Sequence, residues 1–131
     1  MPSIFTRIIE REIPAYILRE DSDFLAFLDI RPIREGHTLV ISKVEIPDVF
    51  DLPESILPGL LPFARPIAHA IQKVTQATRI GMAVIGLEVP HAHLHLVPID
   101  GLHDLDFRRA RPASDEDLAA TAERIRAALA S

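Results

Sequence analysis

Cysteine is absent from the 131 residues of this chain. A disulfide framework, a thiolate zinc site and a cysteine nucleophile are therefore excluded. The absence of thiols is compatible with a reducing compartment.

Long apolar runs are also missing. No window holds about 18 uninterrupted apolar residues, the length from which a membrane-spanning helix is inferred. The start of the chain, residues 1–7, has no apolar stretch of the signal-peptide type. We therefore expect a soluble, cytoplasmic protein with no membrane partner.

Positive charge is scarce. The 14 lysines and arginines are dispersed along the chain, and the net charge is −5. The basic footprint that binds long nucleic acid is therefore absent. An anionic ligand would have to be held locally, by backbone N–H groups, histidines or a helix N-terminus.

Apolar residues, by contrast, make up 48% of the chain, enough for a packed core. The length is that of one ordinary domain, so we predict a single domain over residues 1–131.

The hydrophobic pattern predicts five strands and three helices. The strands are expected at 15–19, 23–28, 37–42, 81–85 and 92–97, and the helices at 4–11, from about Pro66 to residue 76, and from the N-cap Ser114 onward. Pro58 and Pro62 precede Pro66, and an interior proline costs roughly 3 kcal/mol, so the middle helix is predicted only from Pro66. Residues 101–112 are predicted to be a loop. This mixture of elements favours an α+β fold.

Three of the six histidines lie in the run His91-Ala92-His93-Leu94-His95. Alternate side chains of a strand share a face, so the three imidazoles should point one way, about 6.6 Å apart, and the apolar residues the other. Imidazole is a nucleophile when neutral and a donor to phosphate. Such a row can divide the work between attack on phosphorus, donation to phosphate oxygens and control of a tautomer.

Metal binding is the competing interpretation of the histidine run. Same-face histidines two residues apart are a common ligand pair for zinc or iron. The double-stranded barrel metal proteins place a glutamate four or five residues after the second histidine, where this chain has Val97 and Pro98, or Ile99 and Asp100. His37 could serve as a ligand from outside the run, so a metal-dependent hydrolase or oxygenase stays open.

The run from His91 to Val97 resembles the His-x-His-x-His-x-x signature, with x apolar, of the histidine triad (HIT) family of nucleotide hydrolases and transferases. The resemblance extends upstream of this run, where four segments are similar to the N-terminal half of the family: 4–9, 12–15, 24–30 and 36–43. It therefore covers residues 3–99. The resemblance implies an α+β, HIT-like fold, a five-stranded antiparallel sheet with a central helix and a C-terminal helix, and a homodimer.

The resemblance also implies a reaction. It goes through a covalent nucleotidyl-histidine, which water or another acceptor resolves, on purine nucleotides with a leaving group on the α-phosphate, without cofactor or metal. Carried over, His93 would be the nucleophile, His95 would donate to the phosphate oxygens, His91 would orient His93, and His37 would support them from the adjacent strand. Asp29 would accept the ribose hydroxyls. The base and ribose pocket would comprise Phe5, Ile8, Phe27, Leu28 and Ile30.

The chain departs from the family pattern just before the triad. Leu87 stands where a glutamine is common, and Glu88 where some members carry a hydroxyl residue that assists the leaving group. An acid there could protonate a leaving group or repel a second phosphate. The departures favour a substrate with an amine or uncharged leaving group, such as a nucleoside phosphoramidate. They also keep open a non-catalytic nucleotide-binding module.

Overall fold

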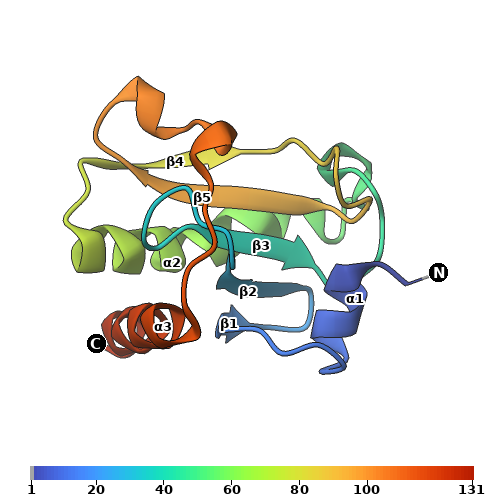
Figure 1. Cartoon of the computed structure of the whole chain (residues 1–131). Coiled ribbons are helices and arrows are strands. Elements are labelled where there is room, and N and C mark those ends of the chain that lie inside the picture. The colour runs from blue at the N-terminus through green and yellow to red at the C-terminus, as the bar shows by residue number, and fades with distance from the viewer. Residues whose placement is uncertain (1) are drawn as a thin grey trace.

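The computed structural model describes residues 2–131, and Figure 1 shows the arrangement of its elements. The helices are α1 (Ile4–Ile9), α2 (Leu60–Thr75) and α3 (Asp115–Ala130), and the strands are β1 (Ile17–Glu20), β2 (Phe24–Leu28), β3 (Thr38–Ser42), β4 (Arg79–Ala83) and β5 (His93–Ile99). The predicted five strands and three helices are all present.

The strands form one antiparallel sheet in the order β1-β2-β3-β5-β4. Strands β1 and β2 form a hairpin, in which the carboxylate of Asp21 accepts hydrogen bonds from the backbone N–H groups of Asp23 and Phe24. The predicted α+β fold with a five-stranded antiparallel sheet is confirmed.

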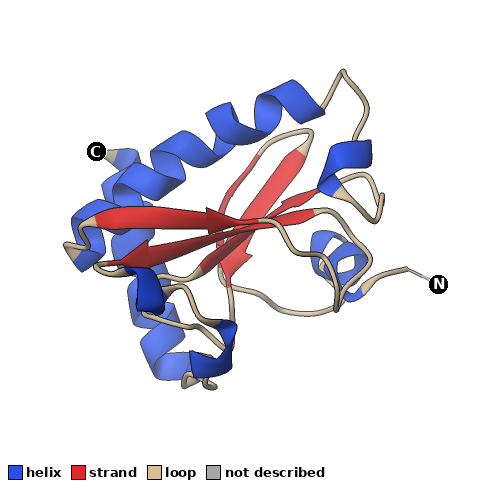
Figure 2. Cartoon of the chain, turned by 90° about the horizontal axis from the view of Figure 1, so that it is seen from above, coloured by secondary structure: helices blue, strands red, loops and turns tan. Residues whose placement is uncertain are grey.

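The sheet is covered on both faces (Figure 2). Phe24, Ala26 and Val40 share a core with α2 and α3 on one face, whereas Leu25 and Ile41 pack with α1 on the other. Double coverage explains why β2 and β3 are buried at every position and read as nearly continuous apolar runs.

Helix α2 begins six residues earlier than the sequence predicted. Pro62 lies in its first turn, where backbone N–H groups have no partner within the helix, so this proline sacrifices no helical hydrogen bond. Pro66 lies inside the helix. The apolar face of Leu60, Phe63, Ala64 and Ile67 is buried against the sheet, and this packing outweighs the cost of the proline.

The ends of the chain follow the predictions with small differences. Helix α1 stops at Ile9 instead of residue 11, and Arg11 adopts a left-handed conformation with φ of 65°. Ser114 caps α3 as predicted, by accepting a hydrogen bond from the N–H of Asp117 at 3.1 Å. The predicted loop at 101–112 contains two short 3-10 turns. Within residues 2–131, no helix combines the length and apolarity needed to cross a membrane.

Candidate active site

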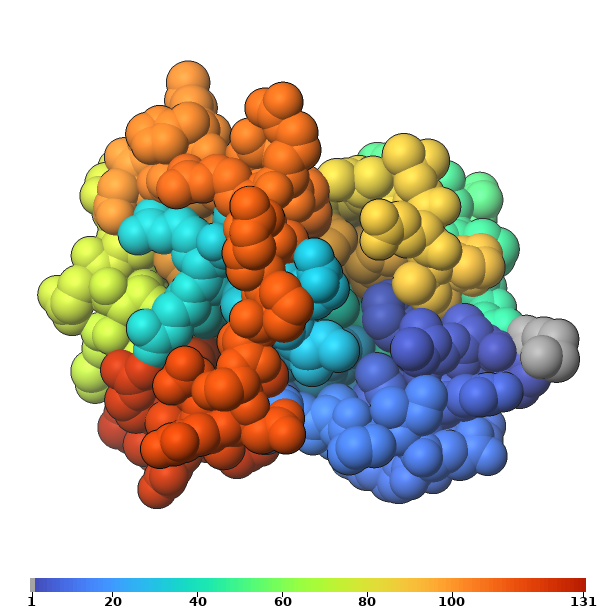
Figure 3. Space-filling model, in the orientation of Figure 1, coloured from blue at the N-terminus to red at the C-terminus, as the bar shows by residue number. Residues whose placement is uncertain are grey.

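The predicted row of histidines lies on the α1 face of the sheet. His93 and His95 belong to β5, where they pair with Ile41 and Leu39 of β3, and His91 lies two residues before the strand begins. The alternate residues Ala92, Leu94 and Leu96 are buried in the opposite core. The strand therefore divides as predicted into an imidazole face and an apolar face. Figure 3 shows this side of the molecule, hollowed between the blue N-terminal part and the orange segment near residue 107.

The ring of His91 is completely buried and both of its nitrogens are engaged. Nε2 lies 2.6 Å from the carbonyl oxygen of Ser42, to which it must donate. Nδ1 lies 2.6 Å from Oγ of Ser3, and that hydroxyl also accepts the N–H of Thr6. Burial lowers the pKa of His91 and so favours the neutral ring; its proton lies on Nε2, and the Ser3 hydroxyl then donates to Nδ1.

His93 is held through the backbone of His91. Its Nδ1 lies 2.6 Å from the His91 carbonyl oxygen and donates to it. In the neutral ring, Nε2 then carries a free lone pair. No fully buried side-chain nitrogen or oxygen among residues 2–131 lacks a partner, and Nε2 of His93 has none there, so this atom is accessible. The orientation expected from the His91 ring is in fact supplied by the His91 carbonyl.

His37 and His95 form a second, directional chain of hydrogen bonds. The N–H of Ile33 donates to Nδ1 of His37 at 3.0 Å, which leaves the His37 proton on Nε2. That proton is donated to Nδ1 of His95, 3.0 Å away. The remaining proton of His95 is therefore on Nε2, and the rings of His93 and His95 lie 5.1 Å apart. The N–H of His95 therefore lies on the ring next to that of His93.

Burial keeps this chain neutral. It lowers the pKa of His37 to about 4. Burial, together with the neighbouring His37 and His93, lowers the pKa of His95 to about 3. Burial also lowers the pKa of His91, against the opposing effects of the Ser42 carbonyl and Glu45. Hence His37 and His95 act as hydrogen-bond donors at neutral pH without carrying charge.

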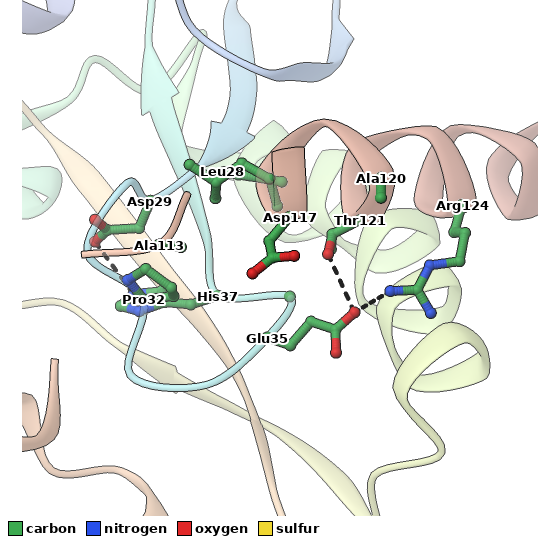
Figure 4. A pocket seen from close by; sticks show the side chains of 12 residues that line it. Leu28, Asp29, Pro32, Glu35, His37, Ala113, Asp117, Ala120, Thr121 and Arg124 are labelled. Atoms are coloured by element: carbon green, nitrogen blue, oxygen red, sulfur yellow. Dashed lines mark hydrogen bonds and ion pairs between the residues drawn. The ribbon is translucent and has the colours of Figure 1, made fainter. Parts of the chain in front are cut away.

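Asp29 directly follows β2 and lies at the edge of this cluster. One carboxylate oxygen accepts the N–H of Arg31 at 2.9 Å, and the other lies 3.6 Å from Nε2 of His37. Burial raises the pKa of Asp29, partly offset by the Arg31 hydrogen bond and by His93. Figure 4 shows Asp29 and His37 together at one end of a cavity of about 450 Å³ that extends toward α3, where Glu35 bonds to Thr121 and Arg124.

Asp29, His37 and His95 each bring one ligand atom to within 4.8 Å of the others, a spacing compatible with a metal ion. The hydrogen bonds argue against this use. Nδ1 of His37 accepts the Ile33 N–H, so the His37 proton occupies Nε2, the atom that faces the other two groups. A metal at Nε2 would require an imidazolate ring, which carries no N–H, or loss of the Ile33 bond. Asp29, His37 and His95 therefore fit a chain of hydrogen bonds better than the metal site considered from the sequence.

The structure brings most, but not all, of the expected pocket residues to the histidine face. Phe5, Ile8 and Phe27 pack there, and the Phe5 ring lies edge-on to His93 with the centroids 5.1 Å apart. By strand alternation the Leu28 side chain points to the opposite face, where it is buried in the core shared with α2 and α3 and lines the cavity that also contains Asp29 and His37. Its role in the base and ribose pocket stays a prediction.

Ile30 and Glu88 are exposed beside the cluster rather than packed in it. Ile30 directly follows Asp29, and its side chain is 62% accessible. Glu88 lies on the exposed segment between β4 and β5, next to Leu87, which is 88% accessible. Both positions can meet a ligand, but neither shapes the histidine cluster.

Two contacts of the cluster were not predicted. Ser3 hydrogen-bonds to His91 across 88 residues of sequence. The sequence feature that could have pointed to Ser3 is its position as the N-cap of α1. Phe107 packs edge-on against His95 with ring centroids 4.7 Å apart. Its signal is an isolated aromatic residue in a polar loop.

Sheet and site together define an α+β protein whose buried histidines share one sheet face with a buried apolar cluster. The chain belongs to the histidine triad family: the model of the HIT domain matches residues 10–102. It is therefore a member of a family of nucleotide hydrolases and transferases.

Three similar proteins place the chain within the family. It is 37% identical to an uncharacterised HIT-like protein of Mycobacterium tuberculosis, over 99% of this chain and 94% of that protein. It is 38% identical to the adenosine 5′-monophosphoramidase of Saccharomyces cerevisiae, over 72% of this chain and 61% of the yeast protein. A Zn-bound histidine triad family protein from Mycobacterium smegmatis superposes with a TM-score of 0.83 at 34% identity, covering 97% of this chain and 92% of that one.

Proposed function

We propose that the chain hydrolyses nucleotides with a leaving group on the α-phosphate, preferentially nucleoside phosphoramidates, through a covalent intermediate on His93. One observation carries this proposal: the hydrogen bond from Nδ1 to the His91 carbonyl leaves Nε2 of His93 with an accessible lone pair. The adjacent His95 offers its Nε2 proton as a donor.

The chemistry follows from these two nitrogen atoms. Nε2 of His93 attacks the α-phosphorus, a phosphorus–nitrogen bond forms, and the bond to the leaving group breaks. An amine leaving group departs with the electron pair of its bond and takes up a proton. Water then attacks the same phosphorus, the bond to His93 breaks, and a nucleoside monophosphate is released.

His95 stabilises the charge that develops on the phosphate oxygens. A neutral N–H donor already in place strengthens its bond as charge grows and needs no reorganisation. His37 keeps the proton of His95 on Nε2, and His91 holds the ring of His93 through its carbonyl group. Each of the four histidines has a distinct task.

The nucleoside end of the substrate is assigned to the pocket next to the cluster. Phe5, Ile8 and Phe27 offer an apolar wall for a purine base. The Asp29 carboxylate accepts the ribose hydroxyls, and Ile30 contacts the sugar from its exposed position. This division places the polar acceptor beside His37 and the apolar wall against α1.

An amine leaving group suits the residues before the triad. Leu87 offers no hydrogen bond to a second phosphate, and the carboxylate of Glu88 would repel one. The same carboxyl group, when protonated, can deliver a proton to the departing nitrogen. The similarity to the yeast adenosine 5′-monophosphoramidase supports the same substrate class.

A homodimer is the proposed assembly. Strand β4 is the last strand of the sheet, and large apolar side chains on it and just beyond it are exposed: Met82, Val84 and Ile85. An exposed apolar edge strand is a site for pairing with another chain. Pairing of two β4 strands would cover these side chains and extend the sheet.

The test of the proposed function is the intact mass of the protein after brief mixing with adenosine 5′-phosphoramidate in the presence of chelator. A quench at mildly alkaline pH preserves a phosphorus–nitrogen bond. Wild type should gain one nucleotidyl group and release AMP, whereas His93→Ala should do neither. His69→Ala, which removes an exposed histidine of α2, serves as the matched control and should behave as wild type.

The alternatives predict different outcomes. Tight AMP binding without adduct or turnover in wild type would identify a nucleotide-binding module. Turnover that returns only when Zn²⁺ is added back would identify a metalloenzyme. An adduct that persists in His93→Ala would show that another residue is the nucleophile.

A further inference from the structure

The connection between β5 and α3, residues 101–112, forms a strap across the face that carries the histidines. In Figure 3 it runs in orange from the upper part of the molecule toward α3, beside the cyan segment that follows β2. Its end is tied to that segment, since the N–H of Arg111 donates to Pro32 and the N–H of Ala113 donates to Ile30. The strap therefore has a defined course.

Asp104 anchors the start of the strap. Its buried carboxylate accepts hydrogen bonds from the N–H groups of Asp100 and Gly101 at 2.7 and 2.9 Å. It also accepts from the guanidinium groups of Arg34 and Arg109. The two backbone N–H groups, with a smaller contribution from Arg34, lower the pKa of Asp104 to about 2. The charged carboxylate of Asp104 and its hydrogen bonds thus fix the first turn of the strap.

The second turn of the strap presents Phe107 to the histidines. The Phe107 ring lies 4.7 Å from the His95 ring and 6.1 Å from the His37 ring, centroid to centroid, and edge-on to both. The side chain is 37% accessible, so one side of the ring covers imidazoles while the other meets solvent. Through Phe107, the strap contacts both rings that form the His37–His95 hydrogen bond.

We propose that Phe107 is a positioning residue, whose ring shields the His37–His95 hydrogen bond from water and holds Nε2 of His95 toward the substrate. This inference rests on the proposed function for its effect on turnover. Its effect on the two histidines can be measured without substrate.

Shielding matters because water would compete for both ends of an imidazole–imidazole hydrogen bond. A hydrogen bond is electrostatically stronger in surroundings of low dielectric constant, and a ring held by packing cannot rotate away from its partner. Edge-on contact places the positive rim of one aromatic ring against the negative face of another. Phe107 thus restrains the orientation of His95 as well as its solvation.

The titratable groups that face His95 and its hydrogen-bond partner come from the sheet. His37, His93 and Asp29 face the ring or its hydrogen-bond partner from the sheet. On the strap, the side chains of Asp106 and Arg108 bond to each other. The contribution of the strap to His95 is therefore mainly the apolar cover of Phe107.

The experiment compares Phe107→Ala and Phe107→Leu with wild type and with a matched control. Leu102→Ala removes a large apolar side chain from the same strap, at a position that is 95% accessible. Steady-state kinetics on adenosine 5′-phosphoramidate gives kcat and KM. Nitrogen-15 NMR of the imidazoles, without substrate, gives the tautomer and the titration of His37 and His95.

Phe107→Ala should lower kcat by about tenfold with KM nearly unchanged, because a misaligned donor weakens the transition state more than the ground state. In the NMR titration, His37 and His95 should protonate at higher pH than in wild type. Phe107→Leu should restore most of both properties, and Leu102→Ala should match wild type. Thermal unfolding of each variant checks that the fold is retained.

Several results would overturn the proposal. Unchanged imidazole titration and unchanged kcat in Phe107→Ala would show that the ring only fills space. A rise in KM alone, with unchanged NMR, would show that Phe107 contacts substrate instead. If wild type has no turnover but the NMR shifts appear, the proposed function fails while the shielding by Phe107 stands.

Discussion

The stability of the protein should fall between pH 7.5 and pH 5.5 because His37 and His95 are buried as neutral rings. Burial lowers their pKa values to about 4 and about 3, from an ordinary value near 6.5. In the unfolded chain both rings take up protons as the pH drops below 6.5, whereas in the folded chain they stay neutral. Unfolding therefore binds protons in this window, and the free energy of unfolding must decrease as the pH falls.

The size of the effect follows from linkage. At pH 5.5 a ring with an ordinary pKa is about ten-elevenths protonated in the unfolded chain, which favours unfolding by about 1.4 kcal/mol for each histidine. His37 and His95 together should reduce the free energy of unfolding by roughly 3 kcal/mol. The pKa values of Glu20, Glu45 and Asp106 are lowered, so these carboxylates lose their contributions mainly at lower pH.

Urea unfolding followed by far-ultraviolet circular dichroism, at half-unit steps of pH, measures the effect. His37→Gln removes one of these buried rings and should eliminate roughly 1.4 kcal/mol of the decrease, to which His91 also contributes because burial lowers its pKa as well. His69→Gln removes an exposed histidine and should keep the wild-type slope. A wild-type stability that is flat from pH 7.5 to 5.5 would refute the assignment of two neutral, buried rings.

Three further predictions test the site and the assembly. His95→Ala should lower kcat by about 10²–10³-fold with little change in KM, the cost of losing one transition-state donor; a loss confined to KM would contradict this role. Asp29→Ala should weaken binding of AMP more than binding of a phosphate ester without ribose, measured by calorimetry, and equal losses would remove the ribose assignment. Met82→Lys should shift the protein from dimer to monomer in sedimentation equilibrium, while a wild type that is already monomeric would exclude pairing through β4.

Elements with a local signal were predictable from the sequence. The alternation of residues 91–96 predicted which side chains would face the core. The structure confirms it: Ala92, Leu94 and Leu96 are buried in the core shared with α2 and α3. Ser114 predicted the start of α3 because a side-chain cap acts within three residues of sequence. The start of α2 was missed because prolines dominate its local propensity, while the burial of Leu60 and Phe63 that compensates for them is a tertiary effect.

Contacts that join distant segments had no such signal. Ser3 and His91 meet only because α1 lies across the sheet face, and Phe107 reaches His95 only because Asp104 folds the strap. For Leu28, the family resemblance supplies a pocket residue without saying from which face of the sheet its side chain contributes. Strand alternation from Phe27 was the signal that assigns Leu28 to the other face.

The proton positions in the site are set largely by the backbone. The His91 carbonyl places the proton of His93, the Ser42 carbonyl places that of His91, and the Ile33 N–H places that of His37. Substitution leaves backbone carbonyl groups in place and removes a backbone N–H only where proline is introduced, so these tautomers should survive most changes in side chains around the cluster. His95 is the exception, because its tautomer depends on the side chain of His37. His95, the proposed donor to the phosphate, is therefore the part of the site most sensitive to its neighbouring side chains, one of which is Phe107 of the strap.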